Sequence, residues 1–585
     1  MYEKAHHQGE HHEVHPMAGS DDAKRDLEKT PTRESNYDLS RIATEDQDYF
    51  VTAKTTIQRQ VAVSVGAPSS QGSWYALRQS GGTTALMTDQ YRITAVFITS
   101  VTISFMVCGA NSDLFGRRYF IVPGHAFVFI GAIVGGTSRS MSQTIAAHVL
   151  LGFGSGNCQL AAFAIPELLP NRWRHIGVVI ADGVTFFAVI AGPVTARVSI
   201  THGDNWRWGY WAVAITIFLG FIPLAFLYYP PKHPRGIPWD QALKHLDWVG
   251  IVSFTLSAAM ILSGIVYVEL RPAGDPIITG LLVAGFGTLL FFALWETFAP
   301  LKEPLAPTRL FTKNKGRALT APFIVGGVVT MFYYGCNIIW GTMISVFFSA
   351  DQSTNVVYWL ATVQGFGILL GGVLLWVCGN YIGHWKWQMG LSVAWMTLFG
   401  GLLAYITPER QALGISFAFL SAVGFGYAQY LSITYIQFGA DQVELGISGG
   451  LAGVSRTAGG AVAATVFLTV LFSVQEGYAA THVVPAAEAA GASPAVAEAV
   501  AKALPLGSAA LKKVPGLTAA IAEAAGAAFV ESFVQGLKTV SLTLMGFGGV
   551  AIIACFFIED IGPKMNKKIE VFLENDVEAS RNKFH

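Results

Sequence analysis

Long apolar runs separated by short polar segments make up most of the chain from about residue 92 onward. Each run has about 20 residues or more, enough for a helix to cross a hydrocarbon core of roughly 30 Å. The runs predict thirteen membrane-spanning helices, at 92–111, 119–137, 144–166, 176–199, 209–229, 247–268, 276–299, 318–348, 355–377, 388–407, 411–437, 446–473 and 539–558. We therefore expect an all-α integral membrane protein.

The first 90 residues contain no apolar run of spanning length. Lys54, Arg59 and Arg78 lie in the stretch 45–90. A Lys or Arg at the centre of a membrane helix costs about 2.5 kcal/mol or more even on lenient insertion scales. We expect residues 1–90 to be a polar, largely disordered region without a clear first helix.

Lysine and arginine are divided unequally between alternate loops. Thirteen lie in the set of loops that contains Arg117 and Lys313, and four lie in the set that contains Arg139. Cytosolic loops carry the excess of positive charge, so the first set is predicted to face the cytosol. The C-terminal tail falls on the same side.

Polar interruptions divide the chain into parts. Residues 474–538, on the outer side, are rich in alanine and broken by prolines, so we expect short helices there. The expected parts are an N-terminal bundle over 91–229, linkers with two extra helices over 230–317, a C-terminal bundle over 318–558 and a cytosolic tail over 559–585.

Composition excludes several classes of protein. The chain of 585 residues is 52% hydrophobic and 13% charged, whereas soluble domains carry about 25% charge. Its formal net charge is +0, so no nucleic-acid partner is indicated. The sequence has no G-x-x-x-x-G-K-[ST] loop for ATP and no metal or nucleophile constellation. We expect neither an enzyme nor a cofactor-dependent protein.

The most specific motif lies between the first two predicted helices. It reads Gly109-Ala-Asn-Ser-Asp113-Leu-Phe-Gly116-Arg117-Arg118. Its glycines permit a tight turn, and its three charges form a switchable set at the membrane surface. A tight loop with ordinary cytosolic arginines is the simpler alternative.

This motif resembles the signature between helices 2 and 3 of the major facilitator superfamily at Gly109, Asp113, Gly116, Arg117 and Arg118. Gly192-Pro193, in the span 176–199, is similar to the Gly-Pro element that marks antiporters in helix 5. An ordinary proline kink also explains that pair.

Further motifs resemble those of fungal fourteen-helix transporters of the trichothecene efflux pump type, which neighbour siderophore transporters. They are Asp113-Leu-Phe-Gly116-Arg117-Arg118-Tyr119-Phe120, Pro166-Glu167-Leu168-Leu169-Pro170, Trp206-Arg207-Trp208 and Tyr229-Pro230-Pro231. The resemblance implies a major facilitator fold, with two six-helix bundles, two extra central helices and, here, a missing first helix. It also implies export of small organic molecules (toxins, secondary metabolites or drugs) by proton antiport and alternating access.

The expected protein is then a monomer with many spans in the plasma membrane, whose partners are lipid, protons and a small-molecule substrate. Two alternatives remain. A siderophore-iron transporter would use the same scaffold, and a non-transporting sensor or decayed paralogue would fit the absence of a first helix.

Ionisable side chains inside membrane spans are costly and are therefore candidates for proton or substrate binding. Asp182 is the leading candidate for the proton site. Arg456 could bind an anionic substrate group or pair with a carboxylate. His148 could relay protons near neutral pH or simply pack.

Polar and aromatic residues within the apolar spans of the second half predict an amphipathic cavity. Aromatic faces with few fixed charges suit bulky, partly apolar ligands, although packing between helices is the more common role of any one such residue. The candidates are Tyr333, Tyr334, Asn337, Trp340, Gln364, Gln429, Tyr435 and Gln437.

Two contacts are predicted on the cytosolic side. Glu167 is expected to pair with Arg117 or Arg118, as an acidic residue does in related transporters. The match of Asp113 to the superfamily motif implies that it contacts the second bundle, and we expect it to close the cytosolic gate by docking at the N-terminus of the span 446–473. That helix start has free N–H groups, and no acidic side chain stands among its residues 446–450.

Overall fold

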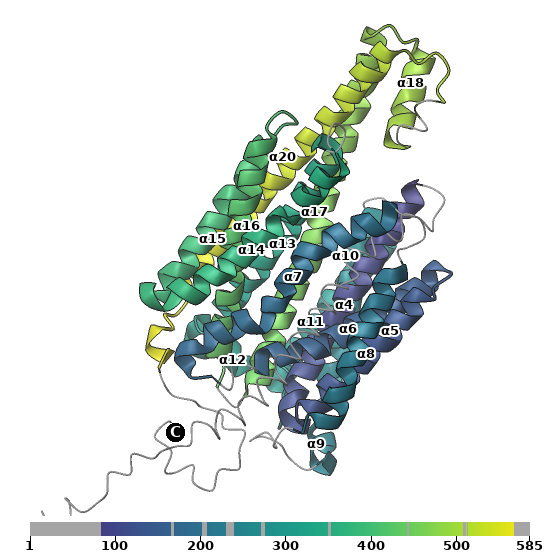
Figure 1. Cartoon of the computed structure of the whole chain (residues 1–585). Helices are drawn as coiled ribbons and strands as arrows, with labels where there is room; N and C mark the ends of the chain where they lie inside the picture. The colour runs from purple at the N-terminus through teal and green to yellow at the C-terminus, as the bar shows by residue number, and fades with distance from the viewer. Residues whose placement is uncertain are drawn as a thin grey trace, which may run out of the picture. The chain divides into compact units, whose positions relative to one another are not determined.

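The computed structural model describes residues 83–164, 169–201, 207–229, 239–270, 275–348, 353–441, 444–506, 511 and 513–566 (Figure 1). Within these residues every long element is a helix, and each predicted span has its helix. These are α4 (Thr83–Phe115), α5 (Arg118–Gly136), α6 (Met141–Ala164), α7 (Arg174–Thr201), α8 (Arg207–Leu227), α10 (Trp248–Leu270), α11 (Pro276–Phe298), α13 (Thr320–Met343), α14 (Thr354–Ile382), α15 (Trp385–Leu402), α16 (Gln411–Gly439), α17 (Leu445–Ala489) and α20 (Ala519–Phe557).

Eleven of the helices in the described ranges are long and apolar enough to cross a membrane. The remaining two long helices, α6 and α7, stay predicted spans. Three shorter α-helices lie between long helices along the chain: α9 (Trp239–His245), α12 (Thr308–Thr312) and α18 (Pro494–Ala503). The predicted all-α membrane fold is confirmed.

The prediction for the N-terminal region falls mainly on residues 1–82, which lie outside the described residues. Residues 83–90 belong to the first turns of α4, so this helix begins nine residues before the predicted boundary at 92. The absence of a first helix therefore remains a prediction.

The segment 474–538 differs from the predicted series of short helices. Within its described residues, only α18 and the one-turn 3-10 helix Leu504–Leu506 fit that description, because α17 continues through Pro485 to Ala489 and α20 already begins at Ala519. The two helices extend past their neighbours with α18 beside them, at the top of Figure 1. Alanine favours helix, and the hairpin buries a small core of its own that includes Val483, Val500 and Ile521. This burial offsets the hydrogen bond that Pro485 cannot donate.

The helices form two bundles with the two extra helices between them in sequence. In the first bundle, α5 and α6 pack together, α4 packs on α6 and α8 on α5. In the second bundle, α17 packs on α13 and α20, and α16 packs on α14 and α15. The extra helix α11 packs on α10, which also contacts α4 and α17.

Two helix pairs make the most extensive contacts between the bundles: α4 with α17, and α7 with α14. The first pair needs small residues, because a Cβ at Gly109 would lie 2.6 Å from the Cα of Gly450. The second is similarly tight, since a Cβ at Gly365 would lie 2.6 Å from a side-chain carbon of Ile190. Close backbone approach of this kind gives membrane helices contact area without bulky side chains.

Candidate gating and transport site

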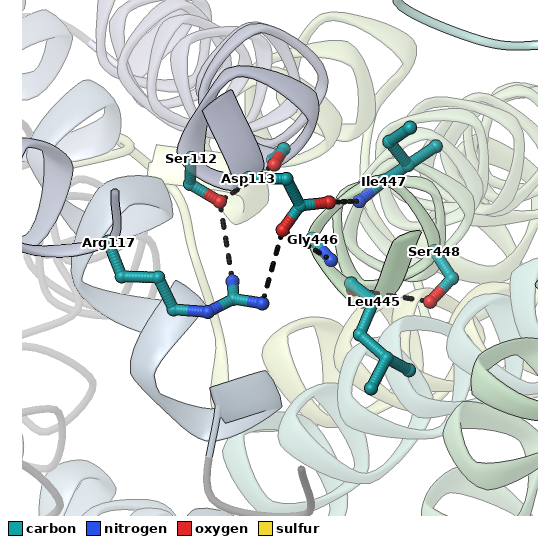
Figure 2. A network of polar contacts seen from close by, with 8 residues as sticks. Ser112, Asp113, Arg117, Leu445, Gly446, Ile447 and Ser448 are labelled. Atoms are coloured by element: carbon teal, nitrogen blue, oxygen red, sulfur yellow. Dashed lines mark hydrogen bonds and ion pairs between the residues drawn. The ribbon is translucent and has the colours of Figure 1, made fainter. Parts of the chain in front are cut away.

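Asp113, near the end of α4, binds the N-terminus of α17 in the opposite bundle (Figure 2). Its Oδ1 accepts a hydrogen bond from the N–H of Gly446 at 3.1 Å, and its Oδ2 accepts one from the N–H of Ile447 at 3.2 Å. The Asp113 side chain is fully buried. First-turn N–H groups have no partner within a helix, and the helix dipole favours a carboxylate there. The predicted docking contact is confirmed.

The turn between α4 and α5 holds the Asp113 carboxylate in place. Arg117 lies 3.3 Å from Asp113 Oδ1 and donates a second hydrogen bond to the hydroxyl of Ser112, also at 3.3 Å. Gly116 has φ of +93°, a conformation that side-chain-bearing residues rarely adopt. A Cβ at Gly446 would lie 2.6 Å from the carboxyl carbon of Asp113, so the contact between Asp113 and α17 also requires glycine at position 446.

Arg118 makes different contacts from those of Arg117. Its guanidinium donates to the carbonyl oxygens of Tyr228 at 2.6 Å and Ala225 at 2.7 Å, and lies 3.6 Å from the ring centroid of Tyr229. These carbonyls end α8, so Arg118 caps a helix C-terminus within the first bundle. Glu167 lies outside the described residues, and its pairing with Arg117 or Arg118 stays a prediction.

The second half of the chain contains a comparable turn between α14 and α15. Gly383 and His384 have φ of +58° and +44°, and Lys386 donates to the carbonyl of Phe556 at 2.7 Å, near the end of α20. A cation thus caps the last helix of each bundle. Asn380 stands three residues before Gly383, as Asp113 stands before Gly116, so only the first turn carries a carboxylate. This arrangement is typical of a duplicated unit.

Sequence reasoning missed a second set of ionic contacts at the same end of the molecule. Arg309 of α12 pairs with the buried carboxylate of Glu444, directly before α17, and Lys313 lies 2.9 Å from Asp441. The hydrogen bond from Lys313 holds the pKa of Asp441 below its ordinary value, assisted by the charges of Lys313, Arg309 and Lys564. In the sequence, Arg309 and Lys313 count only as cytosolic charge. The signal for their pairing is their sign, which is opposite to that of Asp441 and Glu444 in the loop before α17.

Asp182 and Arg456 are brought together across the bundles. Asp182 Oδ2 lies 3.9 Å from Arg456 Nη2, and their side chains are 19% and 25% exposed. At 1.5 Å per residue, Asp182 lies about 12 Å along α7 and Arg456 about 17 Å along α17, both from helix ends on the predicted cytosolic side. The pair therefore lies near the middle of the predicted membrane. From the sequence, Asp182 and Arg456 are separate candidates, and pairing with a carboxylate is one of the two alternatives for Arg456.

Tyr430 of α16 completes this group. Its ring packs against Phe186 of α7 with centroids 5.5 Å apart, and its hydroxyl is within hydrogen-bonding reach of Asp182. Tyr333 and Tyr334 of α13 lie close enough to interact electrostatically with Arg456. Aromatic rings from the second bundle thus surround the charged pair.

Three of the predicted cavity residues line one small pocket in the second bundle. Tyr333, Asn337 and Gln364 contribute to it, together with Phe332, Cys336, Ile368, Ser421, Ala422 and Phe425. Trp340, Gln429 and Tyr435 do not line this pocket. Trp340 donates to the carbonyl of Leu360 at 2.8 Å, the Gln429 amide oxygen accepts from Thr330 at 3.3 Å, and Tyr435 is 1% exposed.

His148 and the Gly192-Pro193 element do not line this pocket. His148 is fully buried, with Nδ1 2.7 Å from the carbonyl of Thr144 and Nε2 3.4 Å from the hydroxyl of Tyr210 on α8. Its partners lie within the first bundle, which favours the packing alternative. Gly192 and Pro193 lie within α7, whose helix continues to Thr201, and their antiporter role stays a prediction.

Comparison with known proteins agrees with this geometry. The model of the family described as "Fungal trichothecene efflux pump (TRI12)" matches residues 72–582. The MFS-type transporter prx5 of Penicillium rubens is 44% identical over 443 residues, covering 75% of this chain and 80% of prx5. The trichothecene efflux pump TRI12 of Fusarium sporotrichioides is 23% identical, over 80% of this chain and 79% of that pump.

Solved structures show the same fold. An auto-inhibited POT family peptide transporter has a TM-score of 0.50 with 15% identity, covering 90% of this chain and 98% of that transporter. A double Trp mutant of XylE also has a TM-score of 0.50, with 14% identity, covering 88% of this chain and 98% of its own. At such identities these likenesses concern the fold alone.

Proposed function

Because the chain belongs to the fungal trichothecene efflux pump family of major facilitator transporters, we propose that it exports small organic molecules in exchange for protons. The two bundles rock about a site near the middle of the membrane, so that this site opens to one side at a time. Cytosolic substrate is carried outward while protons return inward.

The observation that carries this proposal is the bond between Asp113 and the α17 N-terminus. It joins the two bundles at the predicted cytosolic end, so it holds that end closed. A carboxylate at a helix N-terminus contributes roughly 0.3–2 kcal/mol. Two conformations of a protein commonly differ by a few kcal/mol, so forming or breaking this bond shifts their populations substantially. Asp113 therefore serves as a latch.

Asp182 supports the proton-exchange part of the proposal. It is an ionisable group near the middle of the predicted membrane, and such groups mark proton pathways in transporters. Its partner Arg456 belongs to the other bundle. Protonation of Asp182 would weaken a bond between the bundles, which couples proton binding to their movement.

The experiment is transport by purified full-length protein in liposomes with an imposed proton gradient. We expect a tritiated trichothecene to move against its concentration when protons flow the opposite way, and to stop moving when a protonophore collapses the gradient. Asp113→Asn should slow transport while leaving the amount of folded protein unchanged. Movement of a ferric siderophore with no movement of the trichothecene would replace this proposal with siderophore transport, and movement of neither in either direction would overturn it.

A further inference from the structure

Two buried carboxyl groups, those of Asp247 and Glu296, lie side by side at the predicted cytosolic ends of the two extra helices. Asp247 directly precedes α10, and Glu296 lies two residues before the end of α11. The two residues are 5% and 8% exposed, and their carboxyl groups are within hydrogen-bonding reach of each other. Neither group belongs to the latch or to the pair of Asp182 and Arg456.

One oxygen of each carboxyl group has hydrogen-bond donors, and the other has none. Asp247 Oδ1 accepts from the backbone N–H of Gly250 and from the indole N–H of Trp295, both at 2.9 Å. Glu296 Oε1 accepts from the backbone N–H of Leu305 at 3.0 Å. Asp247 Oδ2 and Glu296 Oε2 are buried without a donor among the described residues. Because buried unpaired polar atoms are costly, these two oxygens need a further group between them.

The surroundings supply no cation for this purpose. The elements that pack on α10 and α11 are α4, α12 and α17. The charged and titratable groups of these elements and of the adjoining loops include Asp113, His245, Lys302, Glu303, Arg309 and Arg456. Among the charged groups of the described residues, Asp247 alone acts on the Glu296 carboxyl. Two carboxyl groups this close cannot both ionise without a large cost, so one of them keeps its proton.

We propose that Asp247 and Glu296 form a proton-binding site, in which one proton bridges Asp247 Oδ2 and Glu296 Oε2. A proton fits the site better than a metal ion does, because Mg²⁺ and Ca²⁺ take about six or more oxygen ligands and the site has two free ones. This site goes beyond the proposed transport function. It lies at the edge of the predicted membrane, whereas Asp182 lies near the middle.

The bridging proton holds one end of a segment that we call the strap, residues 299–312. The strap follows α11 and ends with α12. Its Leu305 donates to Glu296, and its Glu303 pairs through the backbone with Leu246, next to Asp247. The start of the strap is therefore attached to the residues that flank and form the proton site.

The other end of the strap reaches the latch. Arg309 of α12 pairs with Glu444, directly before α17, and the N-terminus of α17 is the one that binds Asp113. Loss of the bridging proton leaves two adjacent negative charges, which repel each other strongly in a buried site. This repulsion separates the ends of α10 and α11 and loosens the strap. A bound proton, and hence a lower cytosolic pH, therefore favours the closed latch.

The pH dependence of stability tests the proton site in the purified full-length protein. The folded wild type holds a proton that the separate carboxyl groups of the unfolded chain release above about pH 5. Its folding equilibrium constant should therefore fall by up to about tenfold per pH unit as the pH rises. Glu296→Gln and Asp247→Asn each put an amide N–H in place of the proton, so they should lack this loss.

The measurement is the thermal midpoint of each protein from about pH 5 to pH 9. The wild-type midpoint should drop below those of the two variants as the pH rises. Asp240→Asn is the matched control, because Asp240 is exposed on the neighbouring α9, and it should follow the wild type. Parallel profiles for the wild type and both amide variants would overturn the inference. Failure of both amide variants to fold would also overturn it, because an amide donor is the closest neutral substitute for the proton.

Hydrogen exchange tests the attachment of the strap. At pH 9 the backbone N–H groups of residues 300–306 should exchange faster in the wild type than in Glu296→Gln, and at pH 6 the two proteins should exchange at equal rates. Comparison at the same pH removes the intrinsic effect of pH on exchange. Equal rates at pH 9 would overturn the inference. Neither measurement requires transport, so a failure here is distinct from a failure of the proposed function.

Discussion

The backbone N–H of Arg172 donates to the carbonyl of Asn566 at 2.7 Å, so the segment after the last helix of the second bundle binds the first bundle. Asn171 adds a bond from its amide to the Asn566 side-chain oxygen at 3.2 Å. On the same face, the guanidinium of Arg174 lies 4.5 Å from the ring centroid of Phe438 on α16. Besides the contact between Asp113 and α17, the bundles therefore have a second, separate connection.

We expect Asn566→Ala to weaken this connection by about 1 kcal/mol, since it removes one hydrogen-bond acceptor. The reporter is Ala110→Cys, on the same face of α4 as Asp113, three residues earlier. Its reaction with a maleimide from the cytosolic side should become faster. Because the two connections share no residue, the effect should add to that of Asp113→Asn. No acceleration in either background would show that Asn566 does not hold the bundles together.

Asp113→Asn should open the cytosolic side without unfolding the protein. The amide keeps the size of the side chain but loses the charge that the helix N-terminus favours. A loss of about 1–2 kcal/mol would change the ratio of open to closed forms by about 5- to 30-fold. The rate of Ala110→Cys labelling measures that ratio. Asp441→Asn is the matched control, because Asp441 is 58% exposed at the same end and should leave labelling unchanged.

Gly446→Ala should reproduce the effect of Asp113→Asn from the opposite helix. Its Cβ would lie 2.6 Å from the carboxyl carbon of Asp113, so the carboxylate must move away. Combining the two changes should add little, since both remove one contact. A Cβ at Gly477, in the same helix, would have no atom within 4 Å. Gly477→Ala should therefore leave the labelling rate unchanged. Fast labelling of both Gly446→Ala and Gly477→Ala would indicate distortion of α17 rather than loss of the contact with Asp113.

Arg118→Gln and Lys386→Gln should each lower the thermal stability of the purified protein. Both cations bond to carbonyl oxygens at the end of a bundle's last helix, and charged hydrogen bonds contribute about 1.5–3 kcal/mol. Arg118→Gln should be the more damaging, because Arg118 makes two bonds and also lies over Tyr229. Thermal unfolding in detergent measures the order. Equal midpoints for both variants and the wild type would contradict the capping role.

The contact between Lys313 and Asp441 should persist between about pH 4 and pH 8. Lys313 lowers the pKa of Asp441 from its ordinary 3.8, and a lowered carboxyl pKa means that the stabilisation is present above the unfolded pKa and is lost as the pH falls through the folded one. The stability difference between the wild type and Lys313→Gln should therefore stay constant from pH 8 to 5 and shrink in stronger acid. If the stability difference already shrinks between pH 7 and 5, a titratable group other than Asp441 is responsible for it.

The sequence by itself determined the helices. A bilayer offers no partners to backbone polar groups, so an apolar run of about 20 residues must be a helix. Each of the thirteen predicted runs has its helix among the described residues. The docking of Asp113 was expected for a different reason: the resemblance of its motif implies a contact with the second bundle, and the acid-free start of the span 446–473 offers free N–H groups there.

Only the tertiary structure decided which side chains face one another. Membrane helices are apolar on nearly all sides, so the hydrophobic pattern does not reveal the face that meets a neighbour. For this reason the pairing of Asp182 with Arg456, and of Arg309 with Glu444, depended on the packing of α7, α12 and α17. The sequence also did not show that α17 continues through Pro485. A proline favours the end of a helix, and here the core that α18 and α20 form against α17 offsets that preference.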